Sequence, residues 1–472
     1  MVHNRLSQLF IFIIAFGIYA LGENTPARYL NDSLPDRWVY DEHPNPLPPS
    51  DDCWWKNFND ATLDSLIAEG EAGNYNLLMA SRRIEIARNT LLMARSAYYP
   101  TVDMSAGWQK ARTSAETTIP SHPAETTDFF SLGLSMNWEI DLFGKITAQA
   151  KAKKALLNVS RAQRDAAMIS VAANIAKAYI ELRMYQCELE VARRHLLSQE
   201  KVVKITEARH EAGLASMLDV SQARTVYYST LSSIPSFENS IRASLTSLAI
   251  LLGRYPDEVA ARLSLKADIP DYRQIPAVGI PMDLLRRRPD IIAAEWELAA
   301  YAAELGVAKK DFLPTLSING SIGTSAHRAD DLFTKKSFTY SIAPTLSWTV
   351  FSGMSRRYST AIAKEQMLAG IDNYNLTVMT AVQEVDNAMS AYKFSLMSID
   401  ATEKVVQQST KTLELSVDLY KQGLTAFSNV VDAQMSLLEN DLSLVSLRGQ
   451  AATSLVALYQ SLGGGWTAAP VN

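Results

Sequence analysis

The strongest constraint on the fold is a seven-residue repeat of large apolar residues in the second half of the chain. Large apolar residues occupy every seventh position from Ile371 to Tyr420, and the positions three residues later are nearly all small. This spacing is typical of a coiled-coil helix, and small residues on the second track let neighbouring helices approach closely. About 50 such residues form a rod roughly 75 Å long. We therefore expect a fold built on long, packed helices.

The same pattern occurs 210 residues earlier, from Met168 to Val203, which indicates an internal duplication. Each copy reaches a Gly-Leu pair, at Gly213 and Gly423. Because glycine readily adopts the left-handed conformation that ends a helix, we expect hairpin turns at both glycines. The returning helices are predicted to run from about Leu218 to Leu252 and from Val430 to Leu462.

A pair of alternating apolar and polar segments precedes each rod and predicts two pairs of β-strands. One face of each strand is apolar and the other is small or polar, which suits a bilayer-spanning β-barrel. Trp108, Trp138 and Trp348 are candidates for its aromatic girdle. Pro344 predicts an edge strand or a bulge, since proline donates no ladder hydrogen bond. The strands alone leave open a water-soluble antiparallel sheet. The segments are residues 102–109, 130–140, 316–322 and 338–350.

The number of strands in one chain predicts oligomerisation. A membrane barrel must close, because an open sheet edge in lipid leaves backbone groups unpaired. Two chains would supply about eight strands, whose interior side chains fill the barrel, whereas three would supply about twelve and leave room for a pore. The small alternate residues favour an open lumen, so we expect a trimer.

Composition and the amino terminus narrow the class of protein. The chain has 472 residues and a net charge of −5, so no overall basic field recruits nucleic acid. Two cysteines, Cys53 and Cys187, are too few for a disulfide framework. The first 22 residues are typical of an export signal. No cysteine follows the expected cleavage site, and Cys53 lies too far along, so we expect a non-lipidated amino terminus.

Six segments are expected along the chain. They are a signal peptide (1–22), an extended amino-terminal arm (23–60), a first repeat (61–252), a linker (253–281), a second repeat (282–462) and a carboxy-terminal tail (463–472).

Residue patterns typical of catalysis or cofactor binding are not evident. The histidines have no metal-ligand spacing, and no nucleophile–base or paired-carboxylate pattern stands out, so we expect neither an enzyme nor a bound cofactor or metal. The Arg286–Arg288 run fits an anionic ligand or, as we favour, structural ion pairs before a helix that begins at Pro289 with Asp290.

Several motifs in order resemble TolC-type outer-membrane efflux channels, in the NodT/OprM-like branch that serves resistance-nodulation-division pumps. The motifs are Trp138–Gly144, Leu284–Asp290, Phe312–Pro314 and Leu462–Trp466. The resemblance implies an α+β membrane protein of a Gram-negative outer membrane. It implies a trimer with a twelve-stranded β-barrel, four strands per chain, continuous with a long periplasmic α-helical coiled-coil barrel. It also implies a periplasmic adaptor and an inner-membrane transporter as partners.

The resemblance further implies a channel closed at its periplasmic tip by polar links and an acidic ring. Asp219 and Tyr420 match tip positions, and Asp432 matches one ring position. Asn429 and Thr425 stand where other members have aspartate and arginine, so one link and a second acidic ring are not expected. The alternative is that Asp219 and Asp432 lie in the first turn of a helix and complement its dipole. Opening is expected to move the inner coils outward.

These inferences predict a passive exit duct for drugs or other small toxic compounds. A type I secretion duct for proteins is one alternative. Another is a periplasmic coiled-coil scaffold or adaptor without a pore, which the paired membrane-length strands disfavour.

Overall fold

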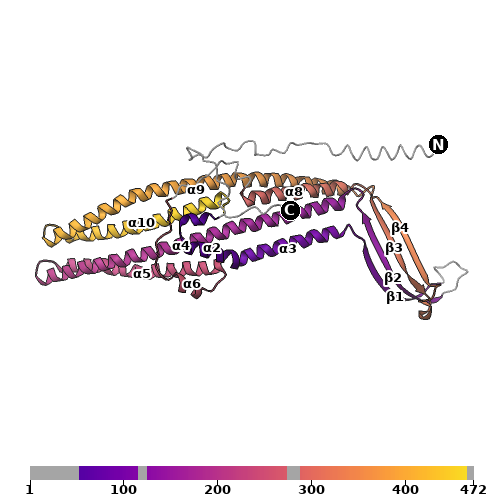
Figure 1. The fold of residues 1–472 in the computed structure, drawn as a ribbon, viewed down its shortest axis with the longest axis horizontal. Helices are drawn as coiled ribbons and strands as arrows, with labels where there is room; N and C mark the ends of the chain where they lie inside the picture. The colour runs from indigo at the N-terminus through magenta and orange to yellow at the C-terminus, as the bar shows by residue number, and fades with distance from the viewer. Residues whose placement is uncertain (1–52, 115–124, 274–286, 465–472) are drawn as a thin grey trace. The chain divides into compact units, whose positions relative to one another are not determined.

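The computed structural model describes residues 53–114, 125–273 and 287–464. It contains long helices and one four-stranded sheet (Figure 1). The chain forms two compact units, and each combines segments of both repeats. The first unit includes residues 84–160 and 293–375, and the second includes 161–292 and 376–472. The predicted signal peptide, most of the arm and most of the tail lie outside the described residues.

The sheet of the first unit is antiparallel, with the strand order β1-β2-β3-β4. The four predicted strands are confirmed, and Pro344 pairs with Ile318 in an unbroken register. Pro344 therefore lies on an edge strand of the chain and not at a bulge. Trp348 lies just beyond the last strand, because that strand ends at Ser347. The strands are β1 (Thr101–Arg112), β2 (Thr126–Ile140), β3 (Thr315–Ala326) and β4 (Phe338–Ser347).

Two helices of 67 residues each, α4 (Lys145–Glu211) and α9 (Ser355–Lys421), form the predicted rods. The seam predicted for α9 is buried at Ile371, Val378 and Val385, which are at most 4% exposed. The rod begins earlier than Ile371, since residues 355–370 are helical without the heptad pattern. Each rod returns as a second helix, α5 (Met217–Leu252) or α10 (Phe427–Ser461).

The apolar core of the second unit lies where the return helices end. Trp54, in the 3-10 helix η2 (Trp54–Phe58), is fully buried and stacks on Tyr459 of α10 with ring centroids 5.3 Å apart. The first repeat begins with two helices, α2 (Ala61–Gly73) and α3 (Tyr75–Ser96). Asn74 separates them because its side chain donates to the Leu251 carbonyl (2.7 Å) and accepts from the Asn76 amide (2.8 Å).

The linker between the repeats begins with α6 (Pro256–Leu263) and crosses the helices of the second unit. The Tyr392 hydroxyl of α9 donates to the Tyr272 carbonyl at 2.6 Å. Arg273 pairs with Glu403 of α9 (3.1 Å), which also accepts from Arg448 of α10 (2.9 Å). The linker thereby fastens α9 to α10.

The remaining elements belong to the second repeat. They are α8 (Pro289–Lys310) and the short η4 (Ala329–Asp331). Of the helices in the described ranges, none combines the length and hydrophobicity needed to cross a membrane.

Candidate functional site

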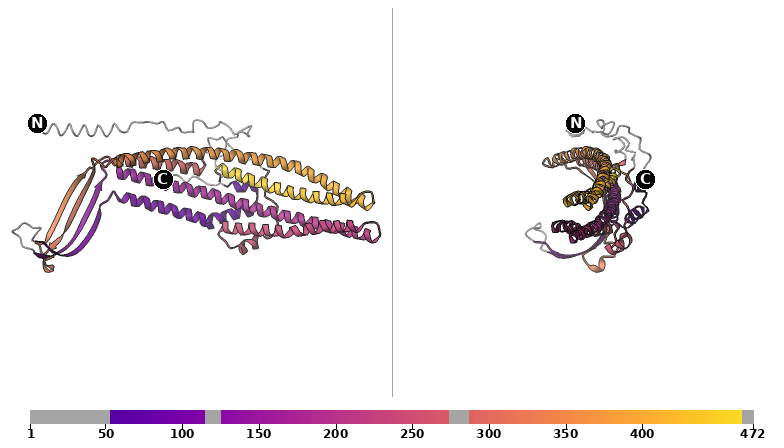
Figure 2. Two further views of the ribbon diagram at one scale, coloured as in Figure 1. Left: turned by 180° about the vertical axis from the view of Figure 1, so that it is seen from behind. Right: turned by 90° about the vertical axis from the view of Figure 1, so that its left-hand side faces the viewer.

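The turns of the two helical hairpins lie at the same end of the second unit in both side views (Figures 1 and 2). Gly213 has φ 71° and Gly423 has φ 76°, which confirms the predicted left-handed turns. In each turn the following leucine amide donates back to the last helical turn, from Leu214 to the Arg209 carbonyl (2.8 Å) and from Leu424 to the Leu419 carbonyl (2.9 Å). The duplicated sequence therefore folds into duplicated turns.

An apolar cluster beneath the turns joins the two repeats. It combines Val202 of α4, Ala223 of α5, Tyr420 of α9 and two residues of α10, Phe427 and Val430. The rings of Tyr420 and Phe427 are 5.0 Å apart, and Tyr420 is 6% exposed. Because all four helices contribute, the two hairpins of one chain pack as one tip.

Tyr420 and Asp219, which were predicted to share the tip, lie together. The Tyr420 hydroxyl donates a long hydrogen bond of 3.4 Å to Asp219 Oδ2. Burial, together with the Asp219 charge, raises the pKa of Tyr420. Asp219 also forms a capping box with Ser216 at the start of α5. Asp219 therefore caps its helix, as the dipole alternative expected, and also contacts Tyr420.

Arg209, which the sequence analysis missed, lies near the end of α4 and contacts the second rod. Its guanidinium donates to the Lys421 carbonyl at 2.6 Å and lies 5.0 Å from the centroid of the Tyr420 ring. It thus ties the end of the first rod to the end of the second by a hydrogen bond and a cation–π contact. The repeat pattern gave no signal for Arg209, since the position 210 residues later is Leu419.

Thr425 and Asn429 do not reach the first hairpin through the contacts of the structure. The Asn429 side chain donates to Thr425 Oγ1 at 2.6 Å, within the same turn. This pair therefore stabilises the start of α10. Within residues 53–114, 125–273 and 287–464, neither side chain has a hydrogen bond to the first hairpin.

Asp432 lies in a different position from that expected. Because α10 begins at Phe427 and not at Val430, Asp432 falls in the second turn of the helix, and the first-turn alternative is wrong for this residue. Its side chain is exposed, and in the described part of the chain it has no hydrogen bond or ion pair. The dipole of α10 therefore does not account for Asp432.

The three predicted girdle tryptophans lie in the first unit. Trp138 and Trp348 donate to carbonyls of the preceding helix–strand junctions, Tyr98 and Phe312 respectively, each at 2.9 Å. Trp108 is 63% exposed on β1 and stacks on Phe130 of β2. Trp138 and Trp348 therefore occupy equivalent places in the two repeats, as their sequence positions predicted.

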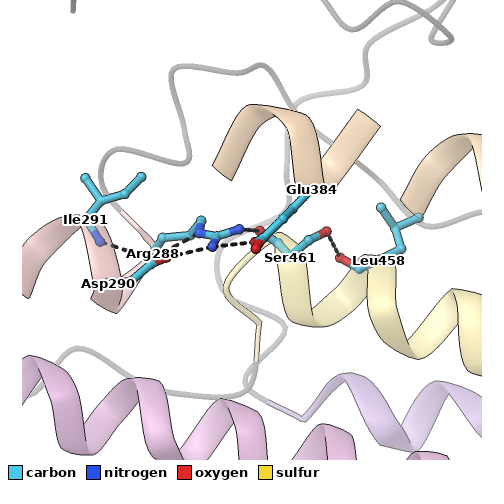
Figure 3. A network of polar contacts seen from close by, with 6 residues as sticks. All are labelled: Arg288, Asp290, Ile291, Glu384, Leu458 and Ser461. Carbon is cyan, nitrogen blue, oxygen red and sulfur yellow. Dashed lines mark hydrogen bonds and ion pairs between the residues drawn. The ribbon is translucent and has the colours of Figure 1, made fainter. Parts of the chain in front are cut away.

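Arg288 forms a network of polar contacts at the start of the second repeat (Figure 3). Its guanidinium donates to Asp290 (2.7 Å), to Glu384 of α9 (2.7 Å) and to the Ser461 carbonyl of α10 (2.9 Å). Burial opposes the charge, but the two carboxylates outweigh burial and raise the pKa of Arg288. The network borders a cavity of about 550 Å³. Structural pairing, which we favoured over an anionic ligand, is confirmed for Arg288, whereas Arg286 lies outside the described residues.

Other chemistry-bearing side chains are dispersed. Within residues 53–114, 125–273 and 287–464 the structure contains no group of three or more His, Cys, Asp or Glu side chains placed to hold a metal ion. Cys53 and Cys187 are free thiols. The buried His195 of α4 instead lies 2.7 Å from the Asp441 carboxylate of α10.

Comparisons with known proteins agree along nearly the whole chain. A family model described as outer membrane efflux protein matches residues 66–254 and 280–464. Nodulation protein T of Rhizobium leguminosarum bv. viciae is 30% identical over 419 residues, covering 89% of this chain and 85% of the relative. The toluene efflux pump outer membrane protein TtgC of Pseudomonas putida is 29% identical, covering 88% and 85%. The solved outer-membrane channel OprN superposes with a TM-score of 0.87 at 28% identity, covering 94% of this chain and 99% of OprN.

Proposed function

Because this chain belongs to the outer membrane efflux protein family, we propose that it is the exit duct through which an inner-membrane transporter expels small toxic molecules. The family resemblance, the trimeric outer-membrane fold and the efflux-channel class predicted from the sequence are confirmed. The cargo, the partners and the gate are proposals, supported by the names of relatives and by the contacts at the tip.

The observation that carries the proposal is the sheet with two open edges. Among the described residues, strands β1 and β4 each pair on one side only. In lipid such edges require partners, and the β4 edge of one copy can pair with the β1 edge of the next. All residues of β1 and β4 are exposed in a single chain, which fits strands whose faces meet lipid on one side and the lumen on the other.

The proposed gate is the tip built by the two hairpins. Tyr420, Asp219 and Arg209 support this assignment, because their contacts join the first repeat to the second at the turns. A few hydrogen bonds, each worth about 1 kcal/mol, hold a closed tip without locking it. Three exposed Asp432 carboxylates around a narrow aperture would favour cations.

The proposed partners are a periplasmic adaptor and a transporter of the resistance-nodulation-division type. Support comes from relatives whose names describe efflux pump components, among them the toluene pump protein of P. putida. A duct that passes cargo without binding it needs no specific pocket, so selectivity is assigned to the transporter.

The test is deletion of the gene, followed by measurement of intracellular accumulation of a fluorescent hydrophobic dye. Accumulation should rise in the deletion strain and return to normal with the wild-type gene, but not with a gene lacking the β1–β2 hairpin. Unchanged accumulation together with the loss of a protein from the culture medium would instead support a secretion duct.

A further inference from the structure

Two glutamines buried between the hairpins have side-chain atoms without partners. Gln199 of α4 is 1% exposed, and both its amide nitrogen and its amide oxygen lack a hydrogen bond. Gln434 of α10 is 2% exposed, and its amide nitrogen lacks one. Nearly all buried polar atoms of native proteins have partners, so two such side chains on packed helices require an explanation.

Gln199 of α4 and Gln434 of α10 lie at corresponding positions along these two antiparallel helices. On the side away from the turns, His195 contacts Asp441 at 2.7 Å. On the side of the turns, Val202 and Val430 belong to the apolar tip cluster. Gln199 falls between His195 and Val202, and Gln434 falls between Val430 and Asp441. These positions place both amides between the His195–Asp441 hydrogen bond and the apolar tip cluster, and we call the two glutamines the polar layer.

This polar layer changes the balance between a closed and an open tip. A buried amide without a partner loses the hydrogen bonds that water would provide, so it destabilises the packed state. If α10 moves away from α4, water reaches both amides and this cost disappears. The free-energy difference between the closed and the open tip is therefore smaller than it would be with apolar side chains at these two positions.

We propose that Gln199 and Gln434 are positioning residues that set how readily the tip opens. The layer lets the part of α10 nearest the turn separate from α4, while the His195–Asp441 pair keeps the helices together beyond it. This inference rests on the proposed gate, because it concerns the ease of opening at Tyr420, Asp219 and Arg209.

The test replaces each glutamine by methionine, which has a similar volume and no amide. Gln199→Met, Gln434→Met and the double variant are made in the wild type and in Arg209→Leu, which we expect to leak because it loses the contacts of Arg209 with Lys421 and Tyr420. Gln407→Met, at an exposed position of α9, is the matched control. The measurements are the open fraction of single channels in planar bilayers and the thermal unfolding of the trimer.

The double variant should lower the open fraction of the Arg209→Leu parent by roughly tenfold and raise the unfolding temperature, whereas Gln407→Met should change neither. A higher unfolding temperature with an unchanged open fraction would overturn the inference, because it would assign the glutamines a structural role only. Loss of the trimer in the single variants would also overturn it. If Arg209→Leu itself does not leak, the proposed gate fails, and the inference fails with it.

Discussion

At the scale of single residues, Arg209 joins the two rods at the tip, which its sequence context does not suggest. One guanidinium reaches the backbone of the opposite rod and the ring of Tyr420. A leucine at this position would keep the helix and remove both contacts. Since the hydrogen bond and the cation–π contact are each worth about 1 kcal/mol, their loss should favour an open tip.

Arg209→Leu should therefore raise the open fraction of the channel by roughly tenfold in planar bilayers. Arg224→Leu is the matched control, because Arg224 pairs with Glu207 inside the first hairpin (2.7 Å) and does not join the repeats. Equal behaviour of the two variants would remove Arg209 from the latch.

Glu188 of α4 predicts a dependence of stability on pH. Burial raises the pKa of this carboxyl from 4.5 to about 7. The folded protein therefore keeps a proton that the unfolded chain releases, so stability falls as the pH rises from about 4.5 to about 7. The full difference is about 3 kcal/mol per chain.

Glu188→Gln should remove this dependence, since glutamine does not titrate. Thermal unfolding of the trimer measured from pH 5 to pH 8 should show a falling midpoint for the wild type and a flatter profile for the variant. Parallel profiles would show that the carboxyl titrates normally in the folded state.

At the scale of elements, two strands approach closely at a pair of glycines. Gly133 of β2 faces Gly323 of β3. A Cβ added at Gly323 would lie 2.6 Å from the Leu132 carbonyl oxygen and 2.8 Å from Gly133 Cα, both of them backbone atoms. A Cβ at Gly320 of the same strand would meet nothing closer than 3.5 Å. The sheet therefore has room for an alanine side chain at Gly320 and not at Gly323.

Gly323→Ala should destabilise the β2–β3 pairing by about 1–3 kcal/mol and lower the yield of the trimer. Gly320→Ala should assemble as the wild type does. The amount of trimer on unheated gels measures both, and a normal yield for Gly323→Ala would contradict the close approach.

The elements differ in how far the sequence predicts them. Periodicity identified the rods, the strands and the glycine turns, because each depends on a local repeat of residue types. Periodicity predicted a start of α10 at Val430, three residues after its actual start at Phe427. Phe427 was missed because it contributes to the tip through contact with Tyr420 and not through a heptad. Periodicity also missed the break at Asn74, where a side chain bonds the Leu251 carbonyl far along the chain.

The candidate site shows the same limit. Asp219 and Tyr420 were found by resemblance, and the structure brings them together. Arg209 was missed because its partners are a backbone carbonyl and the face of a ring, neither of which leaves a motif. The unpaired Gln199 and Gln434 were missed because burial of a glutamine depends on which helices pack together.

At the scale of the whole molecule, Asp432 gains its proposed role only from symmetry. One exposed carboxylate on α10 has little effect alone, whereas three around an aperture attract cations and repel anions. Asp432→Asn should reduce the preference for K⁺ over Cl⁻, measured as the reversal potential across a KCl gradient. Glu439→Gln, a change to another exposed acid of α10, is the control. A reversal potential that is unchanged, or equally changed in both, would place Asp432 outside the aperture.

We propose that three chains join their open sheet edges into one channel with a tip that is mostly closed. The most direct measurement is the single-channel current of the purified, detergent-extracted trimer in planar bilayers. We predict discrete current steps that are small in the wild type and larger or longer in Arg209→Leu. A preparation that runs as a monomer and adds no steps at any protein concentration would contradict the account.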